Sequence, residues 1–184
     1  MHSYLHQRRK RTLELVTFAM LGTILVVSRT ITMVMLPPNV HILAPIMAAS
    51  TIVYRWKALV PIYLFVVLDG LLNQGFTVWW YSWLYVWLPL WAMFMIAGKI
   101  KMPVIAQVIV YGVLCALHGF SFGTLLAPYN ALVFGFGLEW QGMVAWIVRG
   151  LPFDAIHSIG NLVAGTILTV PLAMALKEIK KRQV

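Results

Sequence analysis

The chain has 184 residues, of which 61% are hydrophobic and only 10% are charged, and it carries eight tryptophans and a net charge of +9. This composition is too apolar for the surface of a small soluble domain, so it predicts one integral membrane domain over residues 1–184. The single cysteine, Cys115, excludes a disulfide within the chain and a metal cage built from cysteines. We expect its thiol simply to pack.

The apolar segments predict an all-α membrane protein with six transmembrane helices. A basic start, "MHSYLHQRRKR", precedes the first segment, and no small-residue cleavage site ends that segment early, so it is interpreted as a span and not as a removed signal peptide. The second and third segments are shorter than the ~20 residues that cross hydrocarbon, so a re-entrant hairpin is the alternative for that pair. The six segments are Thr12–Met35, Ile42–Tyr54, Leu59–Leu72, Val78–Ala97, Met102–Leu126 and Pro152–Leu176.

The basic residues predict the orientation of these spans. If both termini are cytoplasmic, twelve of the fourteen Lys and Arg residues lie inside, and only Arg29 and Arg149 lie outside. The net positive charge is therefore explained by Lys and Arg residues that anchor the helices at the membrane edge. It does not indicate a nucleic-acid partner. The inner residues are Arg8, Arg9, Lys10, Arg11, Arg55, Lys57, Lys99, Lys101, Lys177, Lys180, Lys181 and Arg182.

The outer connections are more elaborate than the inner ones. They comprise Leu36–His41, Asn73–Thr77 and the long stretch Ala127–Leu151. The letters "RGLP" interrupt the last apolar run, so we expect Leu138–Arg149 to form a short outer helix or lid and Pro152 to begin the last span. Elaborated outer loops on a plain inner side are typical of a protein that captures a ligand from the exterior.

Aromatic side chains crowd the outer half of the fourth span. Trp79, Trp80 and Tyr81 fit either an aromatic belt at the membrane interface or a ligand wall. Trp83 and Trp87 begin a stripe with helical spacing that extends below interface depth. The stripe fits either the bundle core or the wall of a site for a planar ligand.

The last span carries a polar face. Asp154, His157 and Asn161 fall within about 60° of one another on a helix, and an ionisable group facing hydrocarbon is costly, so we expect this face to contact protein or water. It either lines a substrate site or locks helices together, with His157 bonded to Asp69 or Asp154 in the second case. No metal-ligand spacing and no signature of an intramembrane hydrolase surrounds these residues, so a metal centre and an enzyme are weaker alternatives. Other polar groups of the outer half are Asp69, Asn73 and His118.

The stretches "NVHILAP", "GFTVWWYSW" and "GLPFDAIHSIGN" resemble the substrate-binding S component of an energy-coupling-factor (ECF) vitamin transporter, and within that family the group for cobalamin uptake. The resemblance implies a prokaryotic plasma-membrane subunit, itself neither an enzyme nor a cofactor carrier, that captures a vitamin from outside. Its partners would be a transmembrane coupling protein and two cytoplasmic ATPases; accordingly the chain has no phosphate-binding G-x-x-x-x-G-K-[ST] loop. A pterin, flavin, thiamin or queuosine-type substrate, a stand-alone membrane enzyme and a structural subunit are the alternatives.

These considerations give two sets of expected functional residues. For partner docking we expect small residues on the first helix, Ala19, Gly22 and Thr23, although ordinary helix packing explains this triplet equally well. For the vitamin we expect contacts from Asn39, His41, Asn73, Trp79, Trp80, Tyr81, Trp83, Trp87, Tyr129, Asn130, Arg149 and Asp154.

Overall fold

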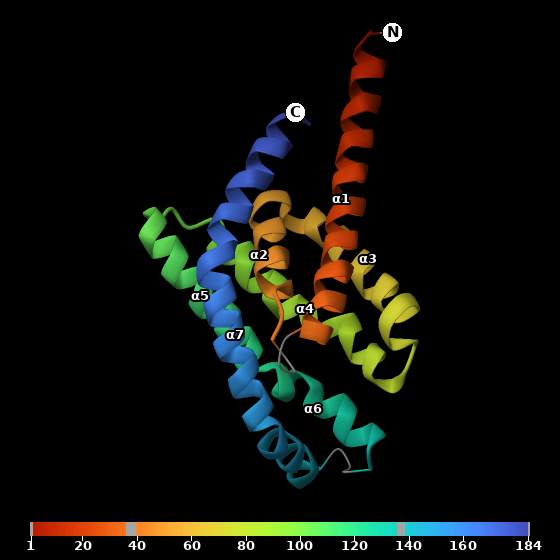
Figure 1. Ribbon diagram of the computed structural model, residues 1–184, viewed down its shortest axis with the longest axis vertical. Helices are drawn as coiled ribbons and strands as arrows, with labels where there is room; N and C mark the ends of the chain where they lie inside the picture. Colours follow the sequence, from red (N-terminus) through yellow and green to blue (C-terminus); the bar gives the residue numbers. More distant parts are fainter. Residues whose placement is uncertain (1, 36–39, 136–138, 184) are drawn as a thin grey trace.

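The computed structural model describes residues 2–35, 40–135 and 139–183, and these are helical apart from short turns, with no strand among them. The prediction of an all-α protein is therefore confirmed. The helices are α1 (His2–Met35), α2 (Leu43–Tyr54), α3 (Leu59–Asp69), α4 (Val78–Ala97), α5 (Val104–Phe120), α6 (Phe122–Val133) and α7 (Trp140–Lys181). A 3₁₀ turn, Arg55–Ala58, follows α2, and a π-helical turn, Gly70–Gln74, follows α3 (Figure 1).

Within the described residues, five helical runs are long and apolar enough to cross a membrane, which is compatible with a multi-pass membrane protein. The count differs from the six expected spans because α2, α3 and their turns form one continuous run. The five runs are Gln7–Met35, Leu43–Gln74, Val78–Ala97, Val104–Val133 and Trp140–Lys181.

The run that contains α2 and α3 reverses direction at Arg55, whose φ of 59° lies in the left-handed region. Beyond this turn, Lys57 Nζ lies 2.7 Å from a carboxylate oxygen of Glu14 in the first half of α1. At the far end of α3, Asp69 lies 4.0 Å from the Nε of Arg29 in the second half of α1. These two ion pairs place α3 alongside the part of α1 between Glu14 and Arg29 (Figure 1).

The expectations for the chain before the last span are wrong. The stretch Ala127–Leu151 is not a long loop, because α6 continues to Val133 and α7 already begins at Trp140. Pro152 does not start a helix either: α7 runs through it, so the expected lid is the first part of α7, except for Leu138, which lies outside the described residues. A proline removes one backbone hydrogen bond, whereas a break would leave several groups unpaired in an apolar environment, so a continuous helix is favoured.

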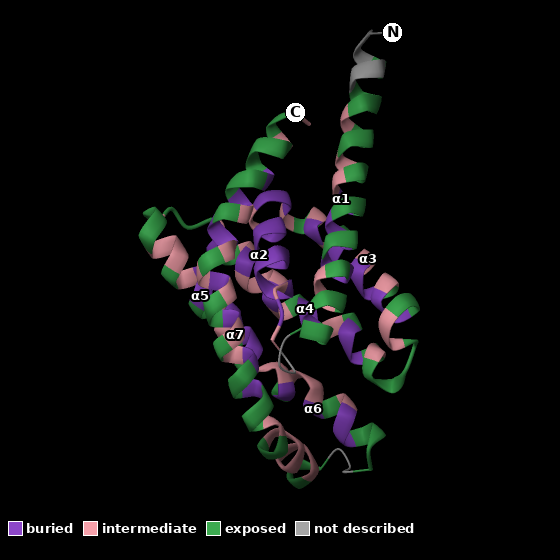
Figure 2. Cartoon of the chain, in the orientation of Figure 1, coloured by how far each residue is buried: buried purple, intermediate pink, exposed green. Residues whose placement is uncertain are grey.

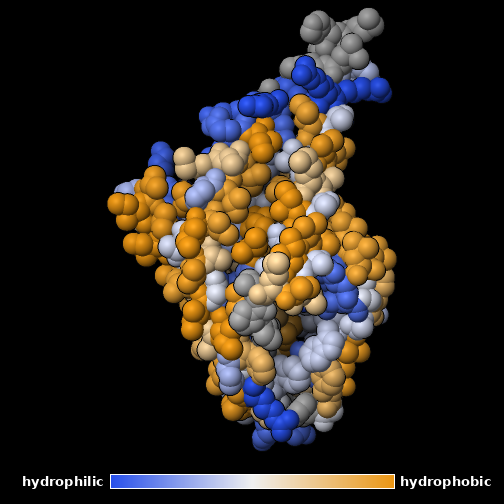
Figure 3. Space-filling model, in the orientation of Figure 1, coloured by the Kyte–Doolittle hydropathy of each residue, from blue (hydrophilic) through white to orange (hydrophobic). Residues whose placement is uncertain are grey.

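The start of α1 and the end of α7 lie at the same end of the molecule (Figure 1). That end is hydrophilic, while the middle of the molecule is covered mainly by hydrophobic side chains (Figure 3). Figure 2 shows that the exposed residues follow the outward faces of the helices, and the buried ones face the interior. An apolar girdle with a basic end is the surface that a bilayer requires.

Helices α5 and α7 pack closely through glycines. A Cβ on Gly165 of α7 would lie 2.8 Å from the Cβ of Cys115, and a Cβ on Gly119 of α5 would lie 2.9 Å from the carbonyl oxygen of His157. Similarly, Gly112 packs directly against Thr166. Small residues let two helix backbones approach each other, so these glycines determine how α7 lies on α5.

The packing predicts that Gly165→Ala will destabilise the protein. The new methyl group has no space beside Cys115, and overpacking of this kind costs about 1–3 kcal/mol. Gly160→Ala on the same helix is the matched control, because its Cβ would meet Val40 at an ordinary distance of 3.4 Å. Thermal unfolding in detergent measures both; equal melting temperatures for the two variants would contradict the packing.

Candidate ligand-binding cavity

A cavity of about 530 Å³ lies between α1, α4, α6 and α7, at the end of the molecule away from the chain ends. Its walls combine aromatic rings with a few polar groups, as in sites for small organic ligands. The lining residues are Arg29, Gln74, Trp79, Ser82, Trp83, Phe122, Gly123, Leu126, Trp146, Arg149, Gly150, Phe153, Asp154 and His157.

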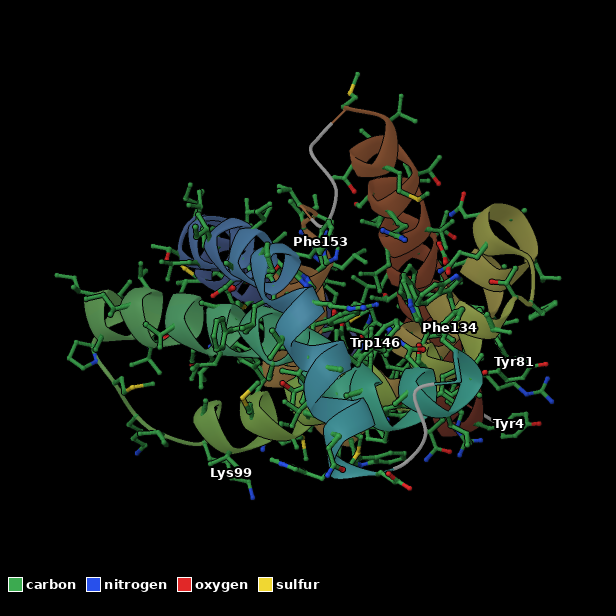
Figure 4. All side chains as sticks on the ribbon, turned by 90° about the horizontal axis from the view of Figure 1, so that it is seen from below. Tyr4, Tyr81, Lys99, Phe134, Trp146 and Phe153 are labelled. Carbon is green, nitrogen blue, oxygen red and sulfur yellow. The ribbon has the colours of Figure 1, made fainter. Side chains whose placement is uncertain are left out.

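Aromatic rings from α4, from α7 and from the end of α6 meet beside the cavity. Phe134, the residue directly after α6, stacks on Trp146 of α7, with ring centroids 5.6 Å apart and planes only 7° from parallel. Trp79 of α4 joins them, with its ring centroid 4.7 Å from that of Phe134 and 6.1 Å from that of Trp146. Figure 4 looks onto this end of the molecule and shows Phe134 and Trp146 side by side. The cavity thus has flat aromatic surfaces close to it.

Asp154 is buried and joins α7 to the start of α6. Its two carboxylate oxygens accept a hydrogen bond from the backbone N–H of Gly123, at 3.0 and 3.1 Å. Gly123 is in the first turn of α6, where backbone N–H groups lack helical partners and a negative charge is favoured. A Cβ at Gly123 would collide with the same carboxylate, so glycine is needed there.

His157 lies one turn deeper on the same face of α7 and is only 2% exposed. Its ring makes edge-on contacts with His41 and Phe122, with centroid distances of 4.7 and 4.8 Å. Its Nε2 has no hydrogen-bond partner among the described residues, and the expected bond to Asp69 or Asp154 is not formed there. Burial holds the pKa of the neighbouring His41, which precedes α2, well below its usual value, so His41 is neutral at pH 7.

Asn161 faces α5 and does not line the cavity. Its side-chain Nδ2 donates to the backbone carbonyl of Cys115 at 3.3 Å, and one turn away Ser158 Oγ donates to that of Ala116 at 3.0 Å. The polar face of α7 therefore has two parts. Asp154 and His157 face the cavity, while Asn161 holds α7 against α5.

Arg29 supplies a cation from α1. Its guanidinium carbon lies 4.9 Å from the ring centroid of Trp83, a cation–π arrangement, and its Nε lies 4.0 Å from Asp69. The Asp69 carboxylate also accepts hydrogen bonds from Asn73 at 2.8 Å and Gln74 at 2.5 Å. Asn73 therefore acts indirectly, by holding the Asp69 carboxylate that lies beside Arg29.

Four of the expected binding residues line the cavity, namely Trp79, Trp83, Arg149 and Asp154. Asn39 lies outside the described residues. The remaining expected residues are described but do not line the cavity: His41, Asn73, Trp80, Tyr81, Trp87, Tyr129 and Asn130.

Four of these remaining residues lie in the core or on the surface. Trp87 is in the core, where its ring stacks on His118 at a centroid distance of 5.6 Å, and Trp80 Nε1 donates to the carbonyl of Val66 at 2.8 Å. Tyr81 is exposed and points away from the cavity (Figure 4). Asn130 is buried, with both side-chain polar atoms unpaired among the described residues.

Sequence reasoning did not include several lining residues in the site, chiefly Arg29, Trp146 and His157. A signal existed for Arg29, because a basic residue within an apolar span is a functional-site candidate by default. Trp146 lies in the stretch that we expect to form an outer lid. It lines the cavity because this stretch is instead the first part of the continuous helix α7. For His157 the sequence leaves a substrate site and a helix lock as alternatives, and the structure places this residue in the cavity wall.

The expected docking triplet on α1 is divided between two faces. Gly22 is buried, and a Cβ there would lie 2.7 Å from Leu64 Cδ2 of α3, so this glycine serves internal packing. Ala19 and Thr23 are exposed, and Thr23 Oγ1 donates to the Ala19 carbonyl at 2.9 Å. Of the three residues, only Ala19 and Thr23 are therefore accessible to a partner.

No family model matches the chain, and neither a curated protein nor a solved structure matches it. Within the described part of the chain, no group of three or more His, Cys, Asp or Glu side chains is placed to hold a metal ion. The proposed function therefore depends on the cavity and on the sequence stretches that resemble a transporter subunit.

We expect Asn161→Leu to lower the melting temperature without weakening ligand binding. The change removes the hydrogen bond to α5 in a fully buried position, a loss of about 1–3 kcal/mol, but leaves the cavity wall intact. Val163→Ala, at an exposed position of the same helix, is the control for stability. Weaker ligand binding at an unchanged melting temperature would instead place Asn161 in the site.

Proposed function

We propose that this chain is the substrate-binding S component of an ECF-type vitamin transporter in a prokaryotic plasma membrane. The observation that carries the proposal is the cavity, in which aromatic walls surround two arginines, a carboxylate and an imidazole whose Nε2 has no hydrogen-bond partner among the described residues. Such polar groups are costly within a membrane unless they serve a ligand or a pathway. The sequence stretches that resemble the family contribute several of these residues.

The arrangement of the helices supports the expected orientation. The reversal at Arg55 allows α2 and α3 to act as two short spans, so that α1, α2, α3, α4, α5 with α6, and α7 make six. The hydrophilic end with both chain ends would be cytoplasmic, in agreement with its basic residues. The cavity, at the opposite end, would then open to the exterior.

The size of the cavity favours the smaller candidate substrates. Pockets of about 300–1,000 Å³ enclose drug-sized ligands, and the volume here, about 530 Å³, is in the lower half of that range. A corrinoid, with its four-ring macrocycle and nucleotide tail, is larger than such ligands. Cobalamin stays the prediction of the family resemblance, but the cavity better accommodates a two- or three-ring vitamin.

The energy for transport would come from partners. The sequence has no phosphate-binding loop of the ATPase type, so we propose that the chain is not an enzyme and works with a coupling subunit and two cytoplasmic ATPases. The exposed pair Ala19 and Thr23 on α1 is the proposed contact for the coupling subunit, because small side chains allow a partner helix to approach closely.

Ligand binding by the purified chain tests the function. The protein in detergent should bind a vitamin from a panel of riboflavin, thiamin, pterin and cyanocobalamin in calorimetry. Trp83→Leu should weaken that binding by about 1–3 kcal/mol, because Trp83 lines the cavity. Trp87→Leu, the matched control one turn away in the core, should lower the melting temperature instead. A folded protein that binds no member of the panel would contradict the proposal.

A second experiment tests docking. Ala19→Trp should prevent copurification with the co-expressed coupling subunit and leave ligand binding unchanged, since Ala19 is exposed and remote from the cavity. Ile109→Trp, at an exposed position on α5, is the control and should assemble normally. If both variants assemble, the α1 face is not the docking surface.

A further inference from the structure

The cavity contains a carboxylate whose acceptor capacity is not used up. A carboxylate offers about four lone-pair positions, and the backbone N–H of Gly123 is shared by both oxygens of Asp154. Asp154 is 4% exposed and lines the cavity. A buried acceptor of this kind is stabilised by further donors, so it favours a ligand that brings N–H groups.

A second polar side chain lies in the wall of the same cavity. His157 follows Asp154 by one helical turn, is 2% exposed and lines the cavity, and its Nε2 is unpaired among the described residues. When its proton is on Nε2, a neutral imidazole donates a hydrogen bond from that atom. The face of α7 thus has a two-oxygen acceptor in the cavity wall and, one turn deeper, a buried imidazole nitrogen that lacks a partner among the described residues.

The rings around these groups favour a flat ligand. Trp79, Trp83 and Trp146 line the cavity together with Phe122 and Phe153. The near-parallel stack of Phe134 on Trp146 adds rigidity to one wall. Flat aromatic surfaces bind planar heterocycles by stacking, and they leave the ring edge free to meet polar groups.

We propose that the cavity binds a planar bicyclic heterocycle with the hydrogen-bonding edge of a 2-amino-4-oxopyrimidine, the edge shared by pterins and guanine. The exocyclic amine and the adjacent ring N–H donate to the two carboxylate oxygens of Asp154. The neighbouring ring carbonyl accepts a hydrogen bond from Nε2 of His157, which is buried until the imidazole ring turns toward the cavity. This inference rests on the proposed function, because it assigns a substrate class to the same site.

Two matched pairs of ligands test the edge. Lumazine differs from pterin, and xanthine from guanine, by a carbonyl in place of the 2-amino group, which would turn an acceptor toward the carboxylate of Asp154. Calorimetry on the full chain in detergent should give at least tenfold tighter binding for pterin than for lumazine, or for guanine than for xanthine. A preference within the pterin and lumazine pair indicates a pteridine substrate, and a preference within the guanine and xanthine pair indicates a purine.

Asp154→Asn tests the assigned residue. The amide oxygen still accepts from the Gly123 N–H, so the start of α6 keeps its cap and the melting temperature should stay near that of the wild type. The amide nitrogen, however, is a donor, so the preference for the 2-amino ligand should fall at least tenfold. Glu139→Gln, an exposed carboxylate at the start of the same helix, loses the same charge and should keep the preference.

The outcomes separate the inference from the function. Equal affinity for both members of each pair, or an unchanged preference in Asp154→Asn, would overturn the inference. Binding of riboflavin or thiamin, with no binding of pterin or guanine, would also overturn it and leave the proposed function intact. If a folded protein binds none of these compounds and no cyanocobalamin, both the inference and the proposed function are wrong.

Discussion

The polar face of α7 is the constraint on which the structure depends. A carboxylate and an imidazole one turn apart cannot face hydrocarbon without a large cost, so α7 must lie with this face against protein. The glycines of α5 and α7 make that possible, because they bring the two backbones close enough for Asn161 to reach the Cys115 carbonyl. Once α7 lies there, Asp154 meets the first turn of α6 through Gly123.

The cavity follows from this arrangement. Because Asp154 holds the start of α6, the far end of that helix brings Phe134 to Trp146 and Trp79. Arg29 closes the side formed by α1, and its charge is balanced by Asp69, which is itself held by two amide side chains. The polar groups of the site are therefore fixed in place by structural contacts, which is the preorganisation that a ligand site needs.

The sequence predicted the helical class, because long apolar segments with basic ends permit few alternatives. It predicted the bounds of α4 at Val78 and Ala97 because turn residues flank that segment on both sides. It failed at Pro152, which indicated a helix start. In the structure α7 runs through this proline, because a continuous helix keeps its backbone hydrogen bonds in an apolar environment. Spacing along one helix also could not separate Trp83, which lines the cavity, from Trp87, which is in the core, because that difference depends on the packing of α6.

The central claim is that the cavity opens to the exterior and holds the ligand, and cysteine accessibility in intact cells tests it most directly. Gly150→Cys places a thiol in the cavity wall, and the buried native Cys115 gives no background. The account predicts that a membrane-impermeant maleimide added outside labels Gly150→Cys and that a saturating ligand slows the labelling. A cysteine at Lys101, near the opposite end, should react only after the membrane is opened. Labelling of the Lys101 position alone from outside, or labelling of Gly150→Cys that no bound ligand slows, would contradict the account.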